Sequence, residues 1–523
     1  MHRFVILSVL FCSLGSVAIA DRPNILLAIS DDQSWAHCSA YSSMMTQTPH
    51  FDRIAREGVL FNNAFCASPG CSPSRAALLT GRNTWQLEHA GTHASYFDPK
   101  YVTYPESLEK AGYFVGSTGK GWGPGNFKKL GRDVNPAGRS FETPSGKVGP
   151  GNYAGAFKHF LEERPEGKPF CFWFGSKDPH RSFKKGSGLE KGKKLEDAEV
   201  PEFLPDTPGV RSDLLDYAFE VERFDDDFGK ILALLETTGE LDNTLVIVTS
   251  DNGMAFPRAK ANCYEYGIHM PLAIRWGGSI PASRTVDDLV GFTDLTATIY
   301  EATGVKPPKE FPIVGKSLLS LLRSEKSGWI EPERDAVFSA RERHSSSRFH
   351  TLSYPQRCIR TRQFLYIRNF KPERWPAGPG QKFDSYQKMV ANEAGAPHGG
   401  YHDIDACPTL TEMIERRSES KIAPLLELSV GLRPAEELFD VQKDPDCLLN
   451  LAKSPQFASV RRELSGRLHR YLHDTGDARV KGKGDVWETY PRVSSIRWFP
   501  TPDWAKENPD SVPEQPWLES RKK

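Results

Sequence analysis

The sequence predicts an α/β protein: a large central, mostly parallel β-sheet with helices on both faces, and a smaller C-terminal α+β domain with a short antiparallel sheet. Two observations favour this fold class. Apolar segments that end in polar residues recur along the first half of the chain, as in strands buried on both faces, and a long amphipathic helix separates two of them. The length of 523 residues suits one large domain with a smaller one attached.

Four segments have the composition of buried parallel strands. They are residues 24–30, 113–120, 169–180 and 244–253, and each runs from apolar into polar or charged residues. Ligands of open parallel sheets bind beyond the carboxyl ends of the strands. We therefore expect the polar residues that end these segments to meet at one edge of the sheet.

Helical periodicity is clearest between the third and fourth of these segments. Apolar residues recur at three- and four-residue spacing over 212–237, which predicts an amphipathic helix. After a second helical segment at 294–304, the proline and lysine content rises at 307–312 and indicates a boundary in the segment that follows. We expect a larger domain over 21–325 and a smaller one over 326–523 that helps to form the substrate pocket. The smaller domain has predicted strands at 364–370 and 436–445 and a predicted helix at 457–473.

The N-terminal segment 1–20 has the features of a secretory signal peptide. Arg3 precedes an apolar run over 4–14, and the small residues Ala18 and Ala20 form a cleavage site. A buried N-terminal helix, the alternative, does not require this order of basic, apolar and small residues. We expect cleavage near Ala20 and export to a periplasmic, extracellular or lysosome-like compartment. No other segment approaches the length of a transmembrane helix.

Charge and cysteine content exclude several classes of protein. Lys+Arg and Asp+Glu both number 67, so the net charge of +0 provides no field for nucleic acid or an anionic membrane. Eight of the nine cysteines lie beyond the signal peptide, without a CxxC pair, which excludes zinc-ribbon and thioredoxin-like sites. The pattern leaves disulfide pairing and oligomeric state open. The Lys- and Gly-rich segment 184–197 is interpreted as a solvated loop, with a grip on a polyanionic substrate as the alternative.

Oxygen-bearing side chains follow two of the predicted strands. Asp31 and Asp32 follow the first, and Asp251 and Asn252 follow the fourth. Adjacent buried carboxylates repel each other unless a cation or strong donors compensate them. Oxygen-only ligands suit Ca²⁺ or Mg²⁺, and in an exported protein we expect Ca²⁺. The alternatives are a helix cap at the first pair and a tight turn at the second.

The segment CSPSRAALLTGR places a cysteine at the start of a predicted helix. Pro73 suits the first helical turn, so Cys71 is expected at the helix N-terminus, where the helix dipole favours negative charge. Arg75, four residues later, lies on the same helical face and can hold an anion over position 71. From these residues alone, Cys71 is a disulfide partner, a thiolate nucleophile or the precursor of a modified residue.

These motifs together resemble the sulfatase family. CSPSRAALLTGR resembles the family signature, GYFVGSTGK at 112–120 resembles its second signature, and SDD at 30–32 and SDNG at 250–253, with Lys260 downstream, fit the same pattern. The resemblance implies an alkaline phosphatase-like fold and a hydrolase acting on sulfated saccharides. Three further segments resemble the sulfamidase branch, which removes N-linked sulfate from glucosamine: FCFWFGSKDPHRSF, SDNGMAFPRAKANCYEYG and LSYPQRCIRTRQFLYIRNF.

The resemblance also implies what becomes of Cys71. A formylglycine-generating enzyme would oxidise it to formylglycine (3-oxoalanine), an aldehyde that hydrates to a geminal diol. One hydroxyl then attacks sulfur and expels the alcohol or amine, and the second loses its proton and ejects sulfate. A serine at this position would attack once and leave a stable sulfate ester.

Other roles follow from the family by matching position. His180 is the expected proton donor to the leaving group, and Arg181 is a substrate contact, with a surface salt bridge as the alternative. The expected ligands of one Ca²⁺ are Asp31, Asp32, Asp251, Asn252 and the modified Cys71, while Arg75 stabilises the modified residue and Lys120 and Lys260 bind the sulfate.

One position departs from the family pattern. Many sulfatases have a histidine two or three residues after the signature lysine, whereas this chain has Trp122 there and no histidine close behind. The group that accepts a proton during sulfate release is therefore unassigned.

Three other functions stay open from the sequence. They are an O-sulfatase on other sulfated polysaccharides, a phosphoester hydrolase of the same superfamily, and an inactive protein that binds sulfated glycans. Phosphoester hydrolases of this superfamily use two transition metals with histidine ligands, and no histidine cluster surrounds 250–253. The residues expected for the nucleophile and the metal site are all present, which disfavours the hypothesis of an inactive binding protein. The C-terminal domain, with Arg357, Arg360, Arg362 and the loop 371–402, is expected to close over the substrate, with surface charges as the alternative for these arginines.

Overall fold

In the computed structural model, the described residues are 22–147, 149–380, 382–385, 388–391 and 400–521. The predicted signal peptide, residues 1–20, lies outside them. The division into domains at 325 and 326 stays a prediction.

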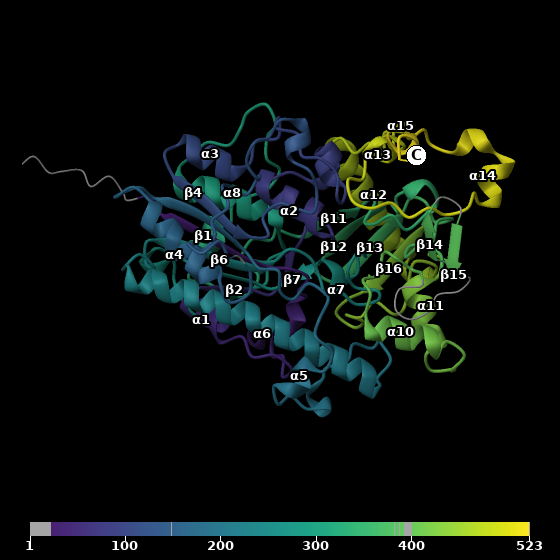
Figure 1. Ribbon diagram of the computed structural model, residues 1–523, viewed down its shortest axis with the longest axis horizontal. Coiled ribbons are helices and arrows are strands. Elements are labelled where there is room, and N and C mark those ends of the chain that lie inside the picture. The colour runs from purple at the N-terminus through teal and green to yellow at the C-terminus, as the bar shows by residue number, and fades with distance from the viewer. Residues whose placement is uncertain (1–21, 148, 381, 386–387, 392–399, 522–523) are drawn as a thin grey trace, which may run out of the picture.

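A seven-stranded sheet forms the centre of the larger part of the molecule (Figure 1). Its strands are β1 (Asn24–Ser30), β2 (Val59–Phe61), β4 (Phe114–Gly119), β5 (Phe170–Gly175), β6 (Thr244–Ser250), β8 (Leu272–Arg275) and β9 (Arg284–Val286). They lie in the order β4-β5-β1-β6-β8-β2-β9. The first four strands in this order, β4, β5, β1 and β6, are parallel to one another, and β2 is parallel to β9. Strand β8 is antiparallel to both of its neighbours, β6 and β2. The predicted large, mostly parallel sheet is confirmed.

Helices cover both faces of this sheet (Figure 1). Because side chains of a strand alternate between faces, β1 contributes to two separate apolar cores. Leu26 belongs to the same core as Phe228, and Leu27 belongs to the opposite core with Leu295. The helices of the first face are α1 (Pro49–Glu57), α4 (Tyr153–Glu163) and α6 (Pro208–Thr237), and those of the second are α2 (Cys71–Thr80), α3 (Tyr104–Lys110) and α8 (Phe292–Thr303).

Helix α6 begins four residues before the expected position at 212. The side chain of Thr207 accepts a hydrogen bond from the Val210 amide at 3.2 Å, and Pro208 occupies the first turn. Both are helix-start signals, because the threonine satisfies a free N–H group and proline needs none. The apolar periodicity marks the residues of the helix that pack in two cores: Phe228 in the core against the sheet, and Leu214 in a separate core with Phe256.

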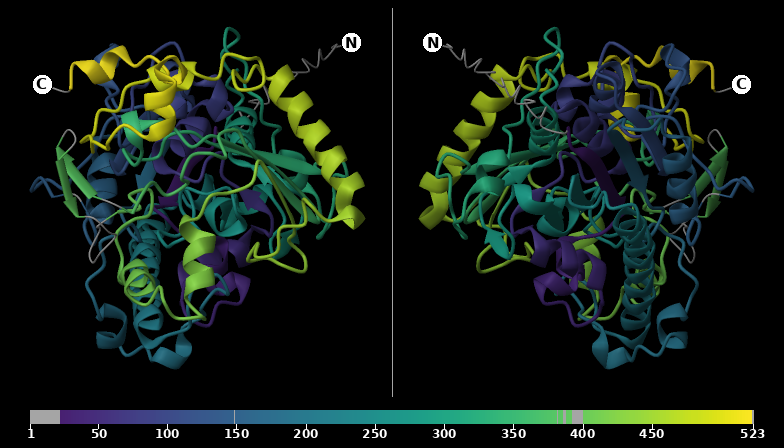
Figure 2. Two further views of the ribbon diagram at one scale, coloured as in Figure 1. Left: turned by 90° about the vertical axis from the view of Figure 1, so that its right-hand side faces the viewer. Right: turned by 90° about the vertical axis from the view of Figure 1, so that its left-hand side faces the viewer.

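A second, antiparallel sheet lies in the C-terminal part of the chain. Its strands are β11 (Ala336–Arg341), β12 (Gln356–Thr361), β13 (Phe364–Asn369) and β16 (Glu436–Asp440), paired in that order. Helix α12 (Ala458–Asp474) lies along the outside of this sheet (Figure 2). Its Leu464 and Leu468 share a core with Ile359 and Leu438 of the sheet. The predicted smaller α+β part with an antiparallel sheet is therefore confirmed.

Short elements complete the described chain. A three-stranded sheet has the order β10 (Val290–Gly291), β3 (Ala64–Phe65), β7 (His269–Met270), and β14 (Lys382–Ser385) pairs with β15 (Lys388–Ala391). The remaining α-helices are α5 (Ser187–Glu190), α7 (Glu265–Ile268), α9 (Leu319–Arg323), α10 (Pro408–Glu415), α11 (Ala423–Val430), α13 (Val486–Thr489), α14 (Asp503–Glu507) and α15 (Pro516–Glu519).

The arginines of β12 hold the protein together instead of facing outward. Arg357 is fully buried, with Nε 2.6 Å from Asp477 Oδ2 and Nη2 2.7 Å from Glu342 Oε1. Arg360 is also buried, and its Nε lies 2.7 Å from Glu265 Oε1. The expectation that these two arginines contact substrate or are surface charges is wrong, because each is paired with carboxylates from other elements.

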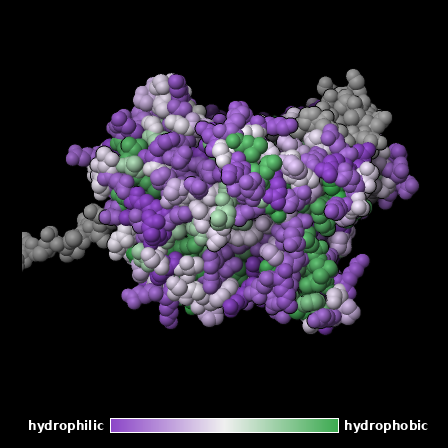
Figure 3. Space-filling model, turned by 90° about the horizontal axis from the view of Figure 1, so that it is seen from below, coloured by the Kyte–Doolittle hydropathy of each residue, from purple (hydrophilic) through white to green (hydrophobic). Residues whose placement is uncertain are grey.

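The surface seen from below is mostly hydrophilic, with hydrophobic residues interspersed (Figure 3). Within the described ranges, no helix is both long and apolar enough to cross a membrane.

Candidate active site

The polar residues that end the central strands meet at one edge of the large sheet, as expected from its parallel topology. Lys120 Nζ, beyond β4, lies 2.6 Å from Asp31 Oδ2, beyond β1. The amide of Asp32 donates to Asp251 Oδ1, beyond β6, at 3.1 Å. The ends of β4, β1 and β6, three strands of one parallel part of the sheet, therefore supply one cluster of charged side chains.

Cys71 is the first residue of α2 and lies against this cluster. Its Sγ is 3.6 Å from Asp31 Oδ1 and 4.0 Å from Asp32 Oδ1, and the residue is 1% exposed. Burial raises the pKa of its thiol well above the ordinary range, although Lys120 and Lys260 oppose the shift. A thiolate nucleophile requires a lowered pKa, so this alternative is disfavoured. All eight described cysteines are free and buried, so no disulfide in the described chain contains Cys71.

Two lysines compensate the paired carboxylates. Lys120 contacts both carboxylate oxygens of Asp31, and Lys260 Nζ lies 2.6 Å from Asp32 Oδ2. Burial would raise the pKa of Asp31, but Lys120, His180 and the other nearby cations outweigh it and hold that pKa below its ordinary range. Asp31 is therefore ionised, and two ammonium groups face the space next to Cys71.

The oxygen donors of this cluster fit a hard divalent cation. Asn252 Oδ1 is buried and accepts no hydrogen bond, which is costly unless a cation or another donor reaches it. Asp31, Asp32 and Cys71 bring one ligand atom each within 4.8 Å of one another. Asp31, Asp32, Asp251 and Asn252 together form the mixed carboxylate and amide set that Ca²⁺ prefers.

Arg75 ties the helix to the strand ends. It is completely buried, with Nε 2.7 Å from Asp251 Oδ2 and Nη1 donating to the Lys120 carbonyl at 2.6 Å. Its Nη2 has no hydrogen-bond partner and lies 3.8 Å from Asp31 Oδ1. The guanidinium therefore fixes Asp251 and the end of β4 relative to Cys71 and keeps one positive face toward the cluster.

Asp405 is a site residue that the sequence reasoning missed. Its Oδ2 lies 2.7 Å from Lys260 Nζ, so one lysine bridges Asp405 and Asp32. Asp405 also forms a second possible metal-holding group with Asp32 and His180. No motif marks this aspartate, because it comes from the segment before α10 and reaches the site only through the tertiary fold.

His180 and Arg181 have different surroundings although they are adjacent. The His180 side chain is 37% exposed, its Nδ1 donates to the Arg181 carbonyl at 2.6 Å, and its Nε2 is 3.8 Å from Asp32 Oδ2. Nε2 therefore faces the cluster. The Arg181 side chain is 5% exposed, forms a bidentate pair with Asp213 at 2.8 and 2.9 Å, and donates to the Ala255 carbonyl. This pairing favours a structural role for Arg181 over the expected substrate contact.

Trp122 occupies the position where a histidine is usual, and it faces the helix instead of the charged cluster. Its Nε1 donates to the Ser72 carbonyl at 3.0 Å, its ring packs edge-on against Phe97, and it is 3% exposed. Indole nitrogen is only a donor. Trp122 can therefore support α2 but cannot accept a proton.

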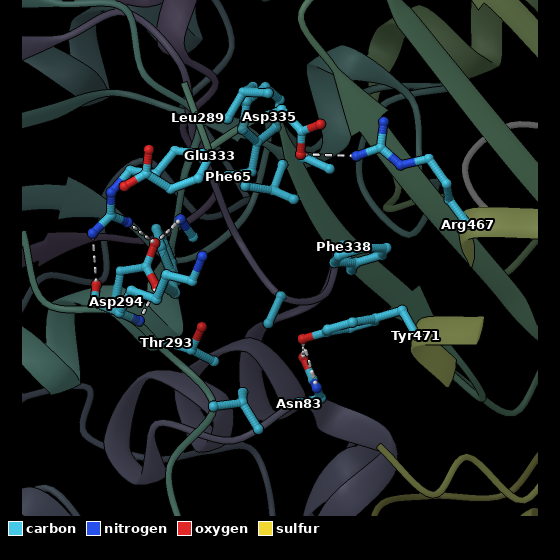
Figure 4. A pocket seen from close by; sticks show the side chains of 18 residues that line it. Phe65, Asn83, Leu289, Thr293, Asp294, Glu333, Asp335, Phe338, Arg467 and Tyr471 are labelled. Atoms are coloured by element: carbon cyan, nitrogen blue, oxygen red, sulfur yellow. Dashed lines mark hydrogen bonds and ion pairs between the residues drawn. The ribbon is translucent and has the colours of Figure 1, made fainter. Parts of the chain in front are cut away.

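A cavity of about 250 Å³ lies between α8, β11 and α12, away from these residues (Figure 4). Four of its charged groups form two pairs: Asp294 with Arg334 at 3.2 Å, and Asp335 with Arg467 at 2.8 Å. No residue expected at the active site lines it. We therefore place the candidate active site at the sheet edge.

Comparison with known families decides the identity of this arrangement. The model of the family described as "Sulfatase" matches residues 23–305, and that described as "N-sulphoglucosamine sulphohydrolase, C-terminal" matches 258–376. The chain belongs to the sulfatase family. The expected activity class, a sulfatase, is thereby confirmed.

Individual relatives are similar over most of the chain. It is 30% identical to human N-sulphoglucosamine sulphohydrolase over 518 residues, covering 89% of this chain and 93% of the relative. It is 25% identical to an ulvan-active sulfatase of Formosa agariphila, covering 88% of this chain and 76% of the relative. A structure solved in complex with D-glucosamine-2-N,6-O-disulfate has the same fold, with a TM-score of 0.62, 19% identity, and coverage of 87% of this chain and 98% of that one.

Proposed function

We propose that this sulfatase is exported and removes N-linked sulfate from glucosamine residues of sulfated saccharides. The observation that carries the proposal is the convergence of Cys71, Lys120 and Lys260 on one carboxylate cluster, in a chain 30% identical to human N-sulphoglucosamine sulphohydrolase. The predicted signal peptide supports export, and a formylglycine-generating enzyme is the expected partner during maturation.

The proposed active form carries formylglycine at position 71 and one Ca²⁺. Hydrated formylglycine supplies a nucleophilic hydroxyl and a second hydroxyl for release of sulfate, and Ca²⁺ supplies a Lewis acid for that chemistry. Asp31, Asp32, Asp251 and Asn252 would hold the ion together with residue 71. The unpartnered, buried oxygen of Asn252 supports this ligand set.

The chain's own cations would bind the sulfate group. Lys120 and Lys260 are held by Asp31 and Asp32 at 2.6 Å, so their ammonium groups keep fixed positions on the two sides of the cluster. Fixed charges stabilise developing negative charge without reorganisation during the reaction. Arg75 of α2 would hold Asp251, and with it the start of α2, in a fixed position relative to the two lysines.

His180 would hold the proton for the leaving nitrogen at Nε2. Its Nδ1 hydrogen bond to the Arg181 carbonyl orients the ring, so Nε2 is the nitrogen left to face the substrate. This arrangement matters most for poor leaving groups such as an amine, which must be protonated as the bond to sulfur breaks.

A substrate panel tests the proposed specificity. The mature, calcium-loaded enzyme would be assayed on N-sulfoglucosamine, on monosaccharides sulfated at single hydroxyl oxygens, and on an aryl sulfate. We expect sulfate release from N-sulfoglucosamine to exceed release from every O-sulfated sugar. Hydrolysis of O-sulfated sugars alone would overturn the N-sulfate assignment while leaving the family assignment intact.

Replacing His180 by glutamine is expected to discriminate between leaving groups. We expect kcat on N-sulfoglucosamine to fall by about 10²–10⁴-fold, because the departing amine loses its proton donor. On an aryl sulfate with an acidic phenol, kcat should change little. Steady-state kinetics on both substrates measures the two effects. An equal loss on both would contradict the role as proton donor.

A further inference from the structure

A pair of histidines that neither the family signatures nor the predicted site includes lies next to Gly70, the residue before Cys71. The rings of His93 and His344 are 4.5 Å apart between centroids, with an interplanar angle of 36°. His93 comes from the segment that follows α2, and His344 follows β11 of the small sheet. The pair is therefore assembled from segments that are about 250 positions apart in the sequence.

Hydrogen bonds hold this pair against the start of α2. The amide of His93 donates to the Arg343 carbonyl at 3.2 Å, and the amide of Ala94 donates to Ser72 Oγ at 3.1 Å. A Cβ placed on Gly70 would lie 3.0 Å from His344 Nδ1. Residues on both sides of Cys71 thus contact the histidine pair or its segment, and a side chain at position 70 would crowd the ring of His344.

The ring nitrogen Nδ1 of His93 is available to accept a proton. It is half-buried, and its Nδ1 is buried without a hydrogen-bond partner. Burial lowers its pKa well below the ordinary value, and the neighbouring His344 and the cations Arg492, Lys260 and Lys120 act in the same direction. The imidazole is therefore neutral, and it lies within the electrostatic reach of both lysines that are proposed to bind sulfate.

We propose that His93, positioned by His344, accepts the proton that must leave residue 71 when sulfate is released. This inference rests on the proposed formylglycine chemistry. The hydroxyl proton moves to a ring nitrogen of His93, the O–H electron pair forms the C=O bond of the aldehyde, and the C–O bond to sulfate breaks with its electrons on the departing sulfate. No oxidant or further reactant is needed.

The charge of the departing group makes this transfer favourable. Sulfate gains a negative charge as the C–O bond breaks, and a neighbouring anion favours the protonated form of an imidazole. The tilted ring of His344 lies against that of His93, while Arg492 donates to the His344 carbonyl at 3.0 Å and anchors the second histidine. Trp122 cannot take this role because its Nε1 donates to Ser72.

The replacement of His93 by glutamine tests the proposal. With the mature enzyme and N-sulfoglucosamine, we expect one rapid release of amine per active site, followed by turnover slowed about 10²–10⁴-fold. The peptide that contains residue 71 should then carry the added mass of one sulfonate group, which the wild-type peptide should not accumulate. His344→Gln should show the same slowed turnover and the same sulfonated peptide, both to a smaller extent.

The control is His89→Gln in the same segment. His89 also has a buried, unpartnered Nδ1, but its ring packs on Tyr96 and Tyr490. The His89→Gln variant should keep wild-type kinetics, and its peptide that contains residue 71 should carry no sulfonate group. His93→Asn, with thermal melting of every variant, separates misfolding from a specific defect, because a misfolded protein gives neither the initial release nor the sulfonate mass.

Three outcomes decide between the inference and the function on which it rests. If His93→Gln and His93→Asn are folded but slow without an initial release or a sulfonated peptide, the role of His93 is overturned and the proposed function stands. If His180→Gln and not His93→Gln accumulates the sulfonated peptide, His180 performs this step and the proposal is again overturned. A wild-type enzyme with an unmodified thiol at position 71 overturns both.

Discussion

Replacement of Cys71 by serine is expected to abolish turnover without unfolding the protein. Serine keeps the size of the side chain at the first position of α2, but it cannot be oxidised to the aldehyde by the same chemistry, and it offers one hydroxyl where two are needed. We expect kcat to fall by a factor on the order of 10⁴ or more. Steady-state kinetics on N-sulfoglucosamine measures this loss, and thermal melting checks the fold.

Cys407→Ser is the matched control for this experiment. Cys407 is likewise buried and precedes a helix, where its Sγ accepts from the Leu410 amide at 3.4 Å. Serine is a favourable residue at such a cap, so activity and melting temperature should be kept. Mass spectrometry of the wild-type protein from its native source should find the aldehyde at position 71. A thiol there, in an active enzyme, would contradict the mechanism.

Removal of calcium with a chelator is expected to inactivate the enzyme and to lower its melting temperature. A cation at about a hundred times its dissociation constant adds about 2.7 kcal/mol to the free energy of unfolding. Without it, Asp31, Asp32 and Asp251 depend on Lys120 and other cations of the chain alone. Calorimetry with and without added Ca²⁺ measures the stabilisation, and calcium titration measures recovery of activity.

Two variants identify which group of ligands holds the ion. Asp251→Asn should remove most of the calcium-dependent rise in melting temperature, because it takes one carboxylate from the proposed set. Asp405→Asn should keep that rise. The opposite result would place the ion between Asp32, His180 and Asp405, the second possible group. Preference for Zn²⁺ over Ca²⁺ would point the same way, because imidazole suits Zn²⁺.

Local patterns predicted much of the fold and of the site. The buried strands β1 and β6 were recognisable because both of their faces are covered, so that every residue from Asn24 to Ser30 and from Thr244 to Ser250 is buried. The polar residues after those strands could be placed together because parallel strands end at the same edge. This reasoning brings Asp31 and Asp251 to one cluster before any contact is known.

The same reasoning failed where a partner from a distant segment decides the role of a side chain. Arg181 looks like an exposed cation in the sequence, yet Asp213 of α6 binds it bidentately. Arg357 looks available for substrate, yet it is buried between Asp477 and Glu342. A charged residue carries no local sign of its partner, because a salt bridge depends on distance in space and not on spacing along the chain.

The sequence by itself determined the parallel sheet, the helix that begins at Cys71 and the charged residues at the strand ends, since each follows from periodicity, capping or strand direction within a short segment. Only the tertiary structure decided that Asp405 reaches Lys260 and that His93 packs against His344 beside Gly70. Those contacts join the large sheet to the C-terminal part of the chain. They depend on how two separately formed layers pack, which no local pattern encodes.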